Sequence, residues 1–183
     1  IVASSNKCLE GVPGVGFAII DEVILLNAAK NSSSLSLNLF DQWQNFKNTG
    51  QWRFTPPTHV LAALDQALIE HEAEGGVEGR GKRYKKNCDT LIKNMQLLGF
   101  KTYLDSKIQS PIIVTFHLPN VKGFNFSEFY ERLLKRGFMI YPGKLTKVDS
   151  FRIGCIGHIT HFDLKNLTEV ICDIIKELGV ELK

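Results

Sequence analysis

The chain has 183 residues, with 44% hydrophobic and 22% charged side chains, which is the composition of an ordinary globular protein. This composition excludes a disordered tail, a collagen and a coiled coil. The 22 basic and 19 acidic side chains give a net charge of +3. That excess is too small to indicate a nucleic-acid partner or an anionic membrane surface. No apolar run approaches the roughly 20 residues of a membrane-spanning helix, so no membrane is expected either.

The chain opens with apolar, strand-like residues rather than with the charged region of a signal peptide. We therefore expect it to be a fragment or a processed piece of a longer protein. Its four cysteines are widely scattered, at positions 8, 88, 155 and 172. In a chain of this length, such scatter favours free thiols in a reducing cytosol over a disulfide scaffold. The expected location is cytoplasmic.

The first half of the chain is predicted to alternate short elements with loops. The elements expected there are strands over residues 1–3 and 15–20, a loop over 4–14, a helix from an Asp21 N-cap to Lys30, and an extended segment over 35–39. Two prolines at positions 56 and 57 then break the chain before a helix for which Thr58 is the expected N-cap. Gly75 and Gly76 interrupt the helical pattern, which resumes and ends at Gly99.

The second half is predicted to form a β/α/β/β/α unit with its own core. Its expected elements are strands over 100–104 and 112–116, a helix over 124–135, strands over 138–141 and 151–153, and a helix after a capping box at Thr160 and Asp163. We expect a domain boundary along the helices between residues 58 and 98. This predicts one domain over 1–75 and a second over 76–183.

A lysine among small residues is the first candidate for chemistry. Lys7 lies in the segment 4–8 (SSNKC), and the glycine-rich segment 11–16 (GVPGVG) follows it. Small neighbours let a flat ligand approach the backbone, and a lysine amine there could form a Schiff base with a carbonyl compound. The alternative is a surface lysine at a turn. The segment is not a P-loop, because no glycine is followed by Lys-Ser or Lys-Thr.

An arginine within an apolar strand is the second candidate. Arg152 lies in the segment 151–154 (FRIG). Its guanidinium needs an anionic partner, and its planar fork suits a carboxylate or a phosphonate. The alternative is an internal salt bridge to one of the 19 acidic residues.

Two further groups are weaker candidates. Cys155, His158 and His161 are residue types that bind zinc, but a fourth ligand at a suitable spacing is missing, so no metal site is expected. In the segment 52–58 (WRFTPPT), hydroxyls and amides at a helix start could hold a phosphate. Helix capping and core packing explain that segment equally well.

Several segments together resemble the 2-aminoethylphosphonate–pyruvate transaminases, which are class V, fold type I aminotransferases. The matching segments, in the order in which that family has them, are 4–17 (SSNKCLEGVPGVGF), 34–44 (SLSLNLFDQWQ), 52–60 (WRFTPPTHV), 74–77 (EGGV), 109–113 (QSPII), 137–144 (GFMIYPGK) and 151–157 (FRIGCIG). The resemblance spans essentially the whole chain. It implies an α/β fold: the end of the large cofactor-binding domain, followed by a small α+β C-terminal domain.

The resemblance also implies the cofactor, the reaction and the site residues. The cofactor is pyridoxal 5'-phosphate, and Lys7 matches the lysine that holds it and moves protons during the reaction. Thr55 matches a threonine that reaches the cofactor phosphate of the partner subunit, so a homodimer is implied. Arg152 matches the arginine that binds the substrate carboxylate. The implied reaction converts 2-aminoethylphosphonate and pyruvate to phosphonoacetaldehyde and L-alanine.

The chain also departs from this family, whose members are roughly twice as long. The half without a counterpart supplies the phosphate-binding loop, a ring-stacking side chain and the aspartate that contacts the pyridine nitrogen. The chain is therefore expected to be the C-terminal half of the enzyme and inactive by itself. Two alternatives stay open: an alanine–glyoxylate or serine–glyoxylate transaminase, and a non-catalytic separated domain.

Overall fold

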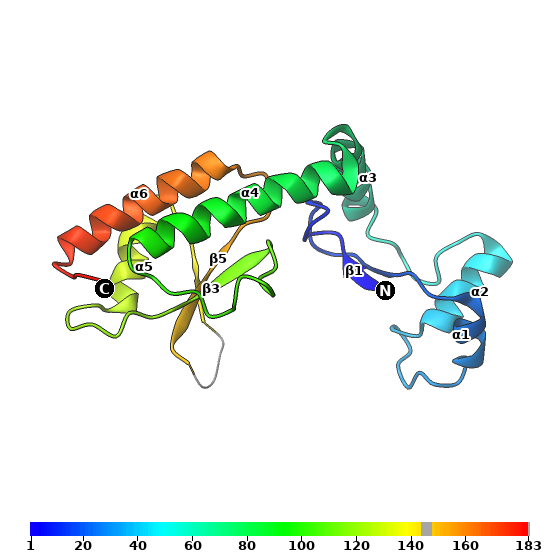
Figure 1. Ribbon diagram of the computed structural model, residues 1–183. Coiled ribbons are helices and arrows are strands. Elements are labelled where there is room, and N and C mark those ends of the chain that lie inside the picture. Colours follow the sequence, from blue (N-terminus) through cyan, green and yellow to red (C-terminus); the bar gives the residue numbers. More distant parts are fainter. Residues whose placement is uncertain (144–147, 183) are drawn as a thin grey trace. The chain divides into compact units, whose positions relative to one another are not determined.

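The computed structural model describes residues 1–143 and 148–182, and it divides the chain into two compact units, Ile1–Glu70 and His71–Lys183 (Figure 1). None of the helices in these residues is long and apolar enough to cross a membrane. The assignment of residues 1–75 and 76–183 to the large and small domains of a longer protein stays a prediction.

The first unit begins with a β-hairpin followed by short helices. Strands β1 (Val2–Ser4) and β2 (Gly16–Ala18) pair antiparallel, and they match the two predicted strands. Helix α1 (Glu22–Asn27) follows. The predicted N-cap is confirmed, because the Asp21 carboxylate accepts hydrogen bonds from the amides of Val23 and Ile24 at 2.9 and 3.2 Å.

Helix α2 (Leu39–Thr49) was not predicted from the sequence. The Asn38 side chain caps it by accepting a hydrogen bond from the Asp41 amide at 3.2 Å, and Gly50 ends it with φ of 69°. The predicted extended segment over 35–39 is wrong. Those residues form a turn that leads into the helix, because a short run of alternating leucines does not pair with any described strand.

Helix α3 (Thr58–Ala73) starts one position earlier than predicted, at the residue that was expected to be its N-cap. The Leu61 amide donates to the Pro57 carbonyl at 3.0 Å, so Pro57 occupies the cap position and Thr58 is the first helical residue. The predicted break at the paired glycines is confirmed: Gly75 and Gly76 have φ of 97° and 64°, a conformation that glycine adopts at little cost.

The second unit contains α4 (Gly76–Leu97), β3 (Ile113–His117), α5 (Phe126–Lys135), β4 (Tyr141–Pro142), β5 (Ser150–Gly154) and α6 (His161–Glu177). This order confirms the predicted β/α/β/β/α unit. Within the described residues, the strands form an antiparallel sheet in the order β3-β5-β4. The capping box of α6 is confirmed, with both Thr160 and Asp163 contributing hydrogen bonds.

Two predicted strands of this unit are much shorter than expected. The segment 100–104 makes a single bridge, between Thr102 and Phe116, and the segment 138–141 is reduced to β4. Both lie at the edges of the sheet, where a strand has a neighbour on one side at most. Apolar residues of these segments, such as Phe100 and Ile140, are instead buried in the core as parts of loops.

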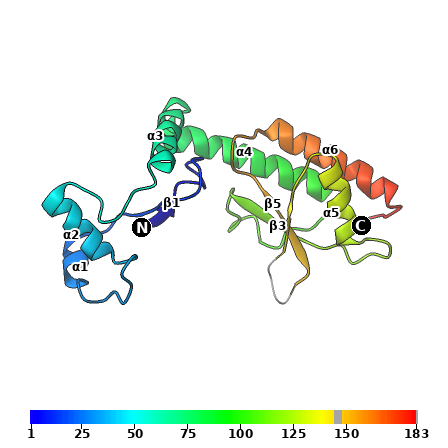
Figure 2. The same cartoon turned by 180° about the vertical axis from the view of Figure 1, so that it is seen from behind.

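The core of the second unit lies on one face of this sheet. Alternate residues of β3 and β5 (Val114, Phe116, Phe151 and Ile153) are buried against α4, α5 and α6. Helices α4 and α6 lie side by side along this core (Figures 1 and 2). The intervening residues of the strands, Arg152 among them, therefore point to the opposite face of the sheet.

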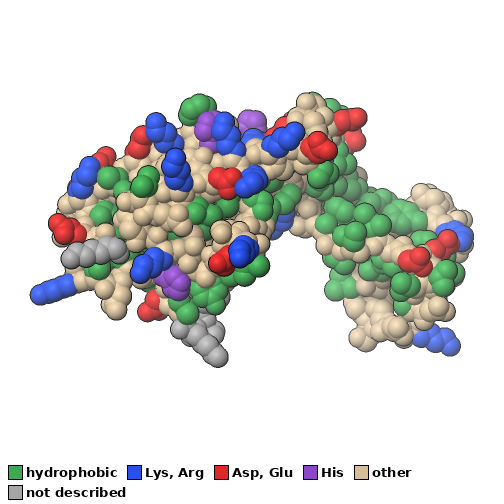
Figure 3. All heavy atoms as spheres, viewed as in Figure 1, with side chains coloured by type: hydrophobic (Ala, Val, Ile, Leu, Met, Phe, Trp, Pro, Cys, Tyr) green, Lys and Arg blue, Asp and Glu red, His purple; other side chains and the backbone are tan. Residues whose placement is uncertain are grey.

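The first unit has almost no core of its own. Among its hydrophobic side chains, all of which are described, only Leu25 and Ala67 are buried. Exposed apolar side chains occur on α1, in the turn before α2 and in the segment between α2 and α3, and hydrophobic side chains are frequent on the surface of this unit in Figure 3. Leu35 and Leu37 are 73% and 77% exposed. A finished domain rarely leaves so much apolar surface in water.

Candidate functional site

Lys7 lies in the turn that directly follows β1, in the first unit. The turn belongs to a loop over residues 5–15, and the fully buried Ser5 closes this loop. The Ser5 hydroxyl donates to the Val12 carbonyl at 2.6 Å, and the Ser5 amide donates to the Val15 carbonyl at 3.1 Å. The Lys7 side chain is exposed, so its amine is accessible to a ligand.

The backbone of the same loop is tightly packed at Gly11 and has an unusual conformation at Glu10. A Cβ on Gly11 would lie 2.9 Å from the Ser5 carbonyl oxygen, a distance that allows no side chain. Glu10 has φ of 60°, which costs a non-glycine residue on the order of 1 kcal/mol. Residues held in such conformations concentrate at functional sites. The lysine therefore lies on a loop whose shape is fixed by its own backbone.

Thr55 lies in the same unit, in the segment between α2 and α3, and its side chain is exposed. The Lys7 loop packs near the start of α3, three residues beyond Pro57: a Cβ on Gly14 would lie 3.0 Å from Val60 Cγ2. The loop of Lys7 therefore lies close to the start of α3, the helix that follows the segment containing Thr55.

Arg152 lies in the second unit, on the central strand of the sheet. Its side chain is partly exposed, on the face opposite the core. Its Nε donates to the Pro142 carbonyl at 3.3 Å, and its Cζ lies 5.9 Å from the centre of the Tyr141 ring. Among the described residues, no acidic side chain forms a salt bridge with it. The internal salt bridge considered for this arginine is therefore not found in the part of the chain that the structure describes.

An ionic network that the sequence did not reveal lies at the start of α4. The Glu74 carboxylate accepts hydrogen bonds from Arg80 Nε and from Arg83 Nε, the latter at 2.6 Å. The hydrogen bond from Arg83 is the main cause that lowers the pKa of Glu74 from 4.5 to about 2, and Arg80 adds to it against the opposing effect of burial. In the sequence, the only indication of this network is that Arg80 and Arg83 follow Glu74 by six and nine residues.

The same network fixes the chain that follows Arg152. Arg83 Nη1 donates to the carbonyls of Gly157 and Ile159 at 2.6 and 3.1 Å. Asn87, one turn further along α4, donates to the carbonyls of Cys155 and Ile159, both at 3.1 Å. The segment 155–159 is thereby held on α4 immediately after the strand of Arg152.

The residues considered for zinc do not gather around a common point. Cys155 is fully buried, whereas His158 is exposed, and His161 stacks on Phe162 with ring centres 4.0 Å apart. A hydrogen bond with Cys88 and burial raise the pKa of the Cys155 thiol. The four cysteines are all free thiols, as the sequence predicted.

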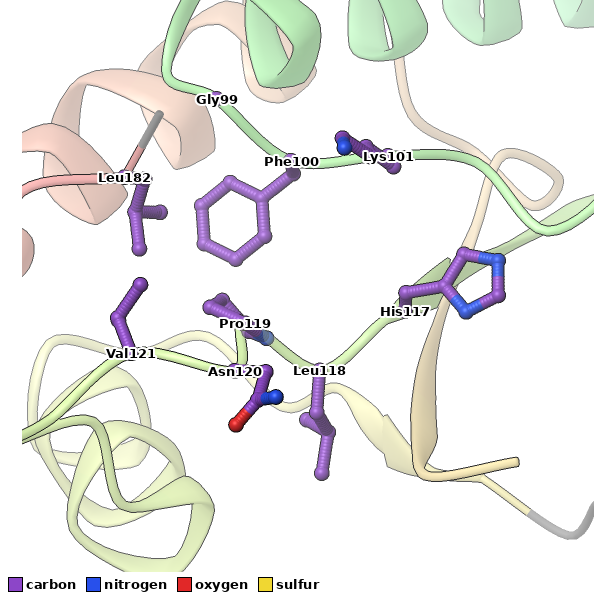
Figure 4. Close-up of a pocket in the computed structure, with 9 residues that line it drawn as sticks. All are labelled: Gly99, Phe100, Lys101, His117, Leu118, Pro119, Asn120, Val121 and Leu182. Carbon is purple, nitrogen blue, oxygen red and sulfur yellow. The ribbon is translucent and has the colours of Figure 1, made fainter. Parts of the chain in front are cut away.

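A separate cavity of about 280 Å³ lies beside the C-terminal segment of the second unit (Figure 4). Phe100, Val121 and Leu182 supply its apolar lining, and Lys101 and His117 lie at its other end. None of the predicted site residues lines this cavity. Its location therefore gives no support to a role in the chemistry of Lys7 or Arg152.

Comparison with known proteins gives relatives along the whole chain, although no family model matches it. It is 48% identical over 183 residues to the 2-aminoethylphosphonate–pyruvate transaminase of Cupriavidus taiwanensis, covering 100% of this chain and 48% of that protein. It is also 48% identical over 180 residues to the Pseudomonas fluorescens enzyme of the same name, covering 98% of this chain and 49% of that protein. The chain thus spans about half the length of these curated relatives.

Solved structures share its fold at much lower sequence identity. Pyridoxamine–pyruvate aminotransferase from Mesorhizobium loti superposes with a TM-score of 0.85 and 19% identity, covering 99% of this chain and 47% of that one. Ureidoglycine–glyoxylate aminotransferase from Bacillus subtilis gives 0.81 and 17%, covering 100% and 48%. The fold is therefore that of the fold type I aminotransferases, as the sequence predicted. Over its whole length, the chain is similar in sequence to about half of a 2-aminoethylphosphonate–pyruvate transaminase.

Proposed function

We propose that this chain is the C-terminal half of a pyridoxal-phosphate-dependent transaminase. The whole enzyme transfers the amino group of 2-aminoethylphosphonate to pyruvate and releases phosphonoacetaldehyde and L-alanine. The observation that carries the proposal is the 48% identity along the full chain with relatives of that name. The same names favour this reaction over the glyoxylate-dependent alternatives.

The loop of Lys7 fits the proposed cofactor. Pyridoxal phosphate binds a lysine amine covalently, and its ring withdraws electrons from the bond that must break. The exposed Lys7 amine on a fixed loop is available for this attachment. Lys7 would also be the base that removes a proton from the substrate carbon and the acid that returns one.

Thr55 and Arg152 have supporting roles in this proposal. The Thr55 hydroxyl, exposed before the first turn of α3, would help to hold the cofactor phosphate of a partner subunit, so the proposed enzyme is a homodimer. Arg152 binds the carboxylate of pyruvate or alanine through its two Nη groups. The small polar substrates and the free thiols fit a cytoplasmic enzyme.

The test is performed on the full-length protein that contains this chain. After incubation with pyridoxal phosphate and reduction with borohydride, peptide mapping should find the pyridoxyl label on Lys7. Lys7→Ala should abolish formation of alanine from 2-aminoethylphosphonate and pyruvate, while the circular dichroism spectrum is unchanged. Lys30→Ala, at another exposed lysine of the same unit, is the matched control and should retain activity.

Two outcomes would contradict the proposal. A label on a lysine other than Lys7 would show that the attachment point is misassigned. Activity with alanine and glyoxylate, but none with 2-aminoethylphosphonate, would show that the protein is a class V enzyme of another specificity.

A further inference from the structure

The face of the sheet opposite the core carries a row of polar side chains around Arg152. Arg152 pairs with Thr115 of β3 on one side and with Tyr141 of β4 on the other. Residues directly opposite one another in antiparallel strands have their side chains on the same face, about 5 Å apart. The guanidinium is thus flanked by one aliphatic hydroxyl and one phenol ring.

Two contacts from β4 fix the orientation of the Arg152 guanidinium. The Pro142 carbonyl accepts the hydrogen bond of Arg152 Nε at 3.3 Å, which occupies the inner edge of the fork. The ring of Tyr141 lies 5.9 Å from Arg152 Cζ, within the range of a cation–π contact. These contacts leave the two terminal Nη groups for an anion. A planar pair of donors at that edge matches the two oxygens of a carboxylate.

The next residue on the same face of β5 leaves room for that anion. Gly154 lies two positions after Arg152, so it faces the same side of the sheet. A Cβ built on Gly154 meets no atom within 4 Å, and its φ is not in the positive region. The position could therefore carry a side chain without strain in this chain, and its lack of one leaves open space beside the guanidinium.

We propose that Tyr141 is the positioning residue for Arg152, and that Gly154 limits the size of the ligand that Arg152 accepts. Tyr141 holds the guanidinium plane so that its Nη edge faces the open side of Gly154. The ligand class is a small carboxylate whose substituent next to the carboxylate fits the space above Gly154. This inference rests on the proposed function for the identity of the carboxylate as a 2-oxo acid.

The first test measures steady-state kinetics of the full-length protein with pyruvate as the varied substrate. Tyr141→Leu should raise KM for pyruvate roughly three- to tenfold, the equivalent of a lost cation–π contact, with little change in kcat. Tyr141→Phe keeps the ring and should change KM less than about twofold. Gly154→Val should raise KM for pyruvate and should raise it more for 2-oxobutyrate, which is one methylene larger.

Tyr103→Leu is the matched control. Tyr103 is a second half-exposed tyrosine of this unit, but its ring contacts His117, with centres 5.6 Å apart, and it lies beside β3 rather than beside Arg152. KM for pyruvate should be unchanged in this variant. An equal effect of Tyr103→Leu and Tyr141→Leu, or an effect that appears only in kcat, would overturn the positioning role. Equal KM ratios for the two oxo acids in Gly154→Val would overturn the size limit.

A second measurement separates this inference from the proposed function. In the 183-residue chain, the Nε–H signal of Arg152 is assigned by its loss in Arg152→Lys, and it is then titrated with pyruvate by NMR. Tyr141→Leu should shift this signal in the free chain through loss of the ring current and weaken the pyruvate response severalfold, whereas Tyr141→Phe should do neither. An unshifted signal in Tyr141→Leu would refute the contact even if the enzyme proves active. A wild-type full-length protein without transaminase activity would refute the proposed function, and the NMR result would still decide the inference.

Discussion

Replacing Glu74 with glutamine is expected to destabilise the second unit by about 2 kcal/mol. The substitution keeps the size of the side chain but removes the charge that Arg80 and Arg83 share. It also weakens the hold of Arg83 on the Gly157 and Ile159 carbonyls, because the carboxylate fixes the orientation of that guanidinium. The expected loss thus includes the attachment of the 155–159 segment to α4.

The magnitude follows from the position of the carboxylate. The pKa of Glu74 is about 2 instead of 4.5, and each pKa unit corresponds to about 1.4 kcal/mol, which gives roughly 3 kcal/mol as an upper limit. The side chain of Glu74 is 25% exposed, so solvent screens part of this interaction. Arg80 is only 5% exposed, and the loss of a carboxylate beside a buried cation is costly. We therefore expect about 2 kcal/mol after screening.

The assay is urea unfolding of the 183-residue chain at about pH 6.5, followed by circular dichroism. In thermal unfolding, the same loss of about 2 kcal/mol corresponds to a fall in Tm of roughly 4–8 °C for a chain of this size. Asp89→Asn is the control on the same helix, because Asp89 forms a solvent-exposed salt bridge with Lys85. Exposed pairs of this kind contribute less than about 1 kcal/mol. If Glu74→Gln costs no more than this control, the network does not stabilise the unit.

The pH dependence of this difference has a definite sign. The pKa of Glu74 is lower in the folded state, so its stabilisation is complete above pH 4.5 and is lost as the pH falls toward about 2. Glutamine has no proton to gain in this range. The stability difference between wild type and Glu74→Gln should therefore be full near neutral pH and largely gone at about pH 2.5. A difference that stays constant with pH would mean that the glutamine acts through packing.

Two further predictions concern single side chains. In the native chain, iodoacetamide should modify the exposed Cys8 first, and the buried Cys88 and Cys155 should react only after unfolding. Mass spectrometry of partly alkylated protein gives the order of modification. Early modification of Cys155 would contradict its burial. Arg152→Ala in the full-length protein should weaken pyruvate binding roughly 30-fold, the lower end for loss of a charged partner because Arg152 is partly exposed. Arg152→Lys should not restore binding, since an ammonium group lacks the planar fork; unchanged pyruvate affinity together with lower stability would assign Arg152 a structural role instead.

The long helices and the order of the elements could be predicted from the sequence, because periodic apolar residues determine both. The stripe of α6 and its capping box are examples, with Leu164, Leu167 and Ile171 buried as their spacing requires. Helix α2 could not be predicted in the same way. Its apolar residues Leu39, Phe40, Trp43 and Phe46 do have helical spacing, but the alternating leucines before them favour an extended segment. The start of the helix depends on a hydrogen bond of the Asn38 side chain.

The residues of the candidate site were recognisable, but their surroundings were not. Lys7 and Arg152 were singled out by their neighbours in the sequence. The hydrogen bonds of Ser5 join positions seven and ten residues apart, and the contact of Arg83 with Gly157 joins positions 74 apart. No local pattern encodes such contacts, since they depend on how separate elements pack. The lack of an acidic partner for Arg152 among the described residues is likewise a property of the folded chain.

The closed loop around Ser5 bears on the order in which the enzyme is assembled. The loop is closed by hydrogen bonds between its own residues. The Ser5 hydroxyl donates to the Val12 carbonyl, and the Gly11 amide donates to the Ser5 carbonyl. The loop can therefore take its shape during folding, before any ligand arrives. Attachment of the proposed cofactor to Lys7 is then a bimolecular reaction with a loop that already has its final shape. Its rate should rise in proportion to cofactor concentration instead of following the rate of chain folding.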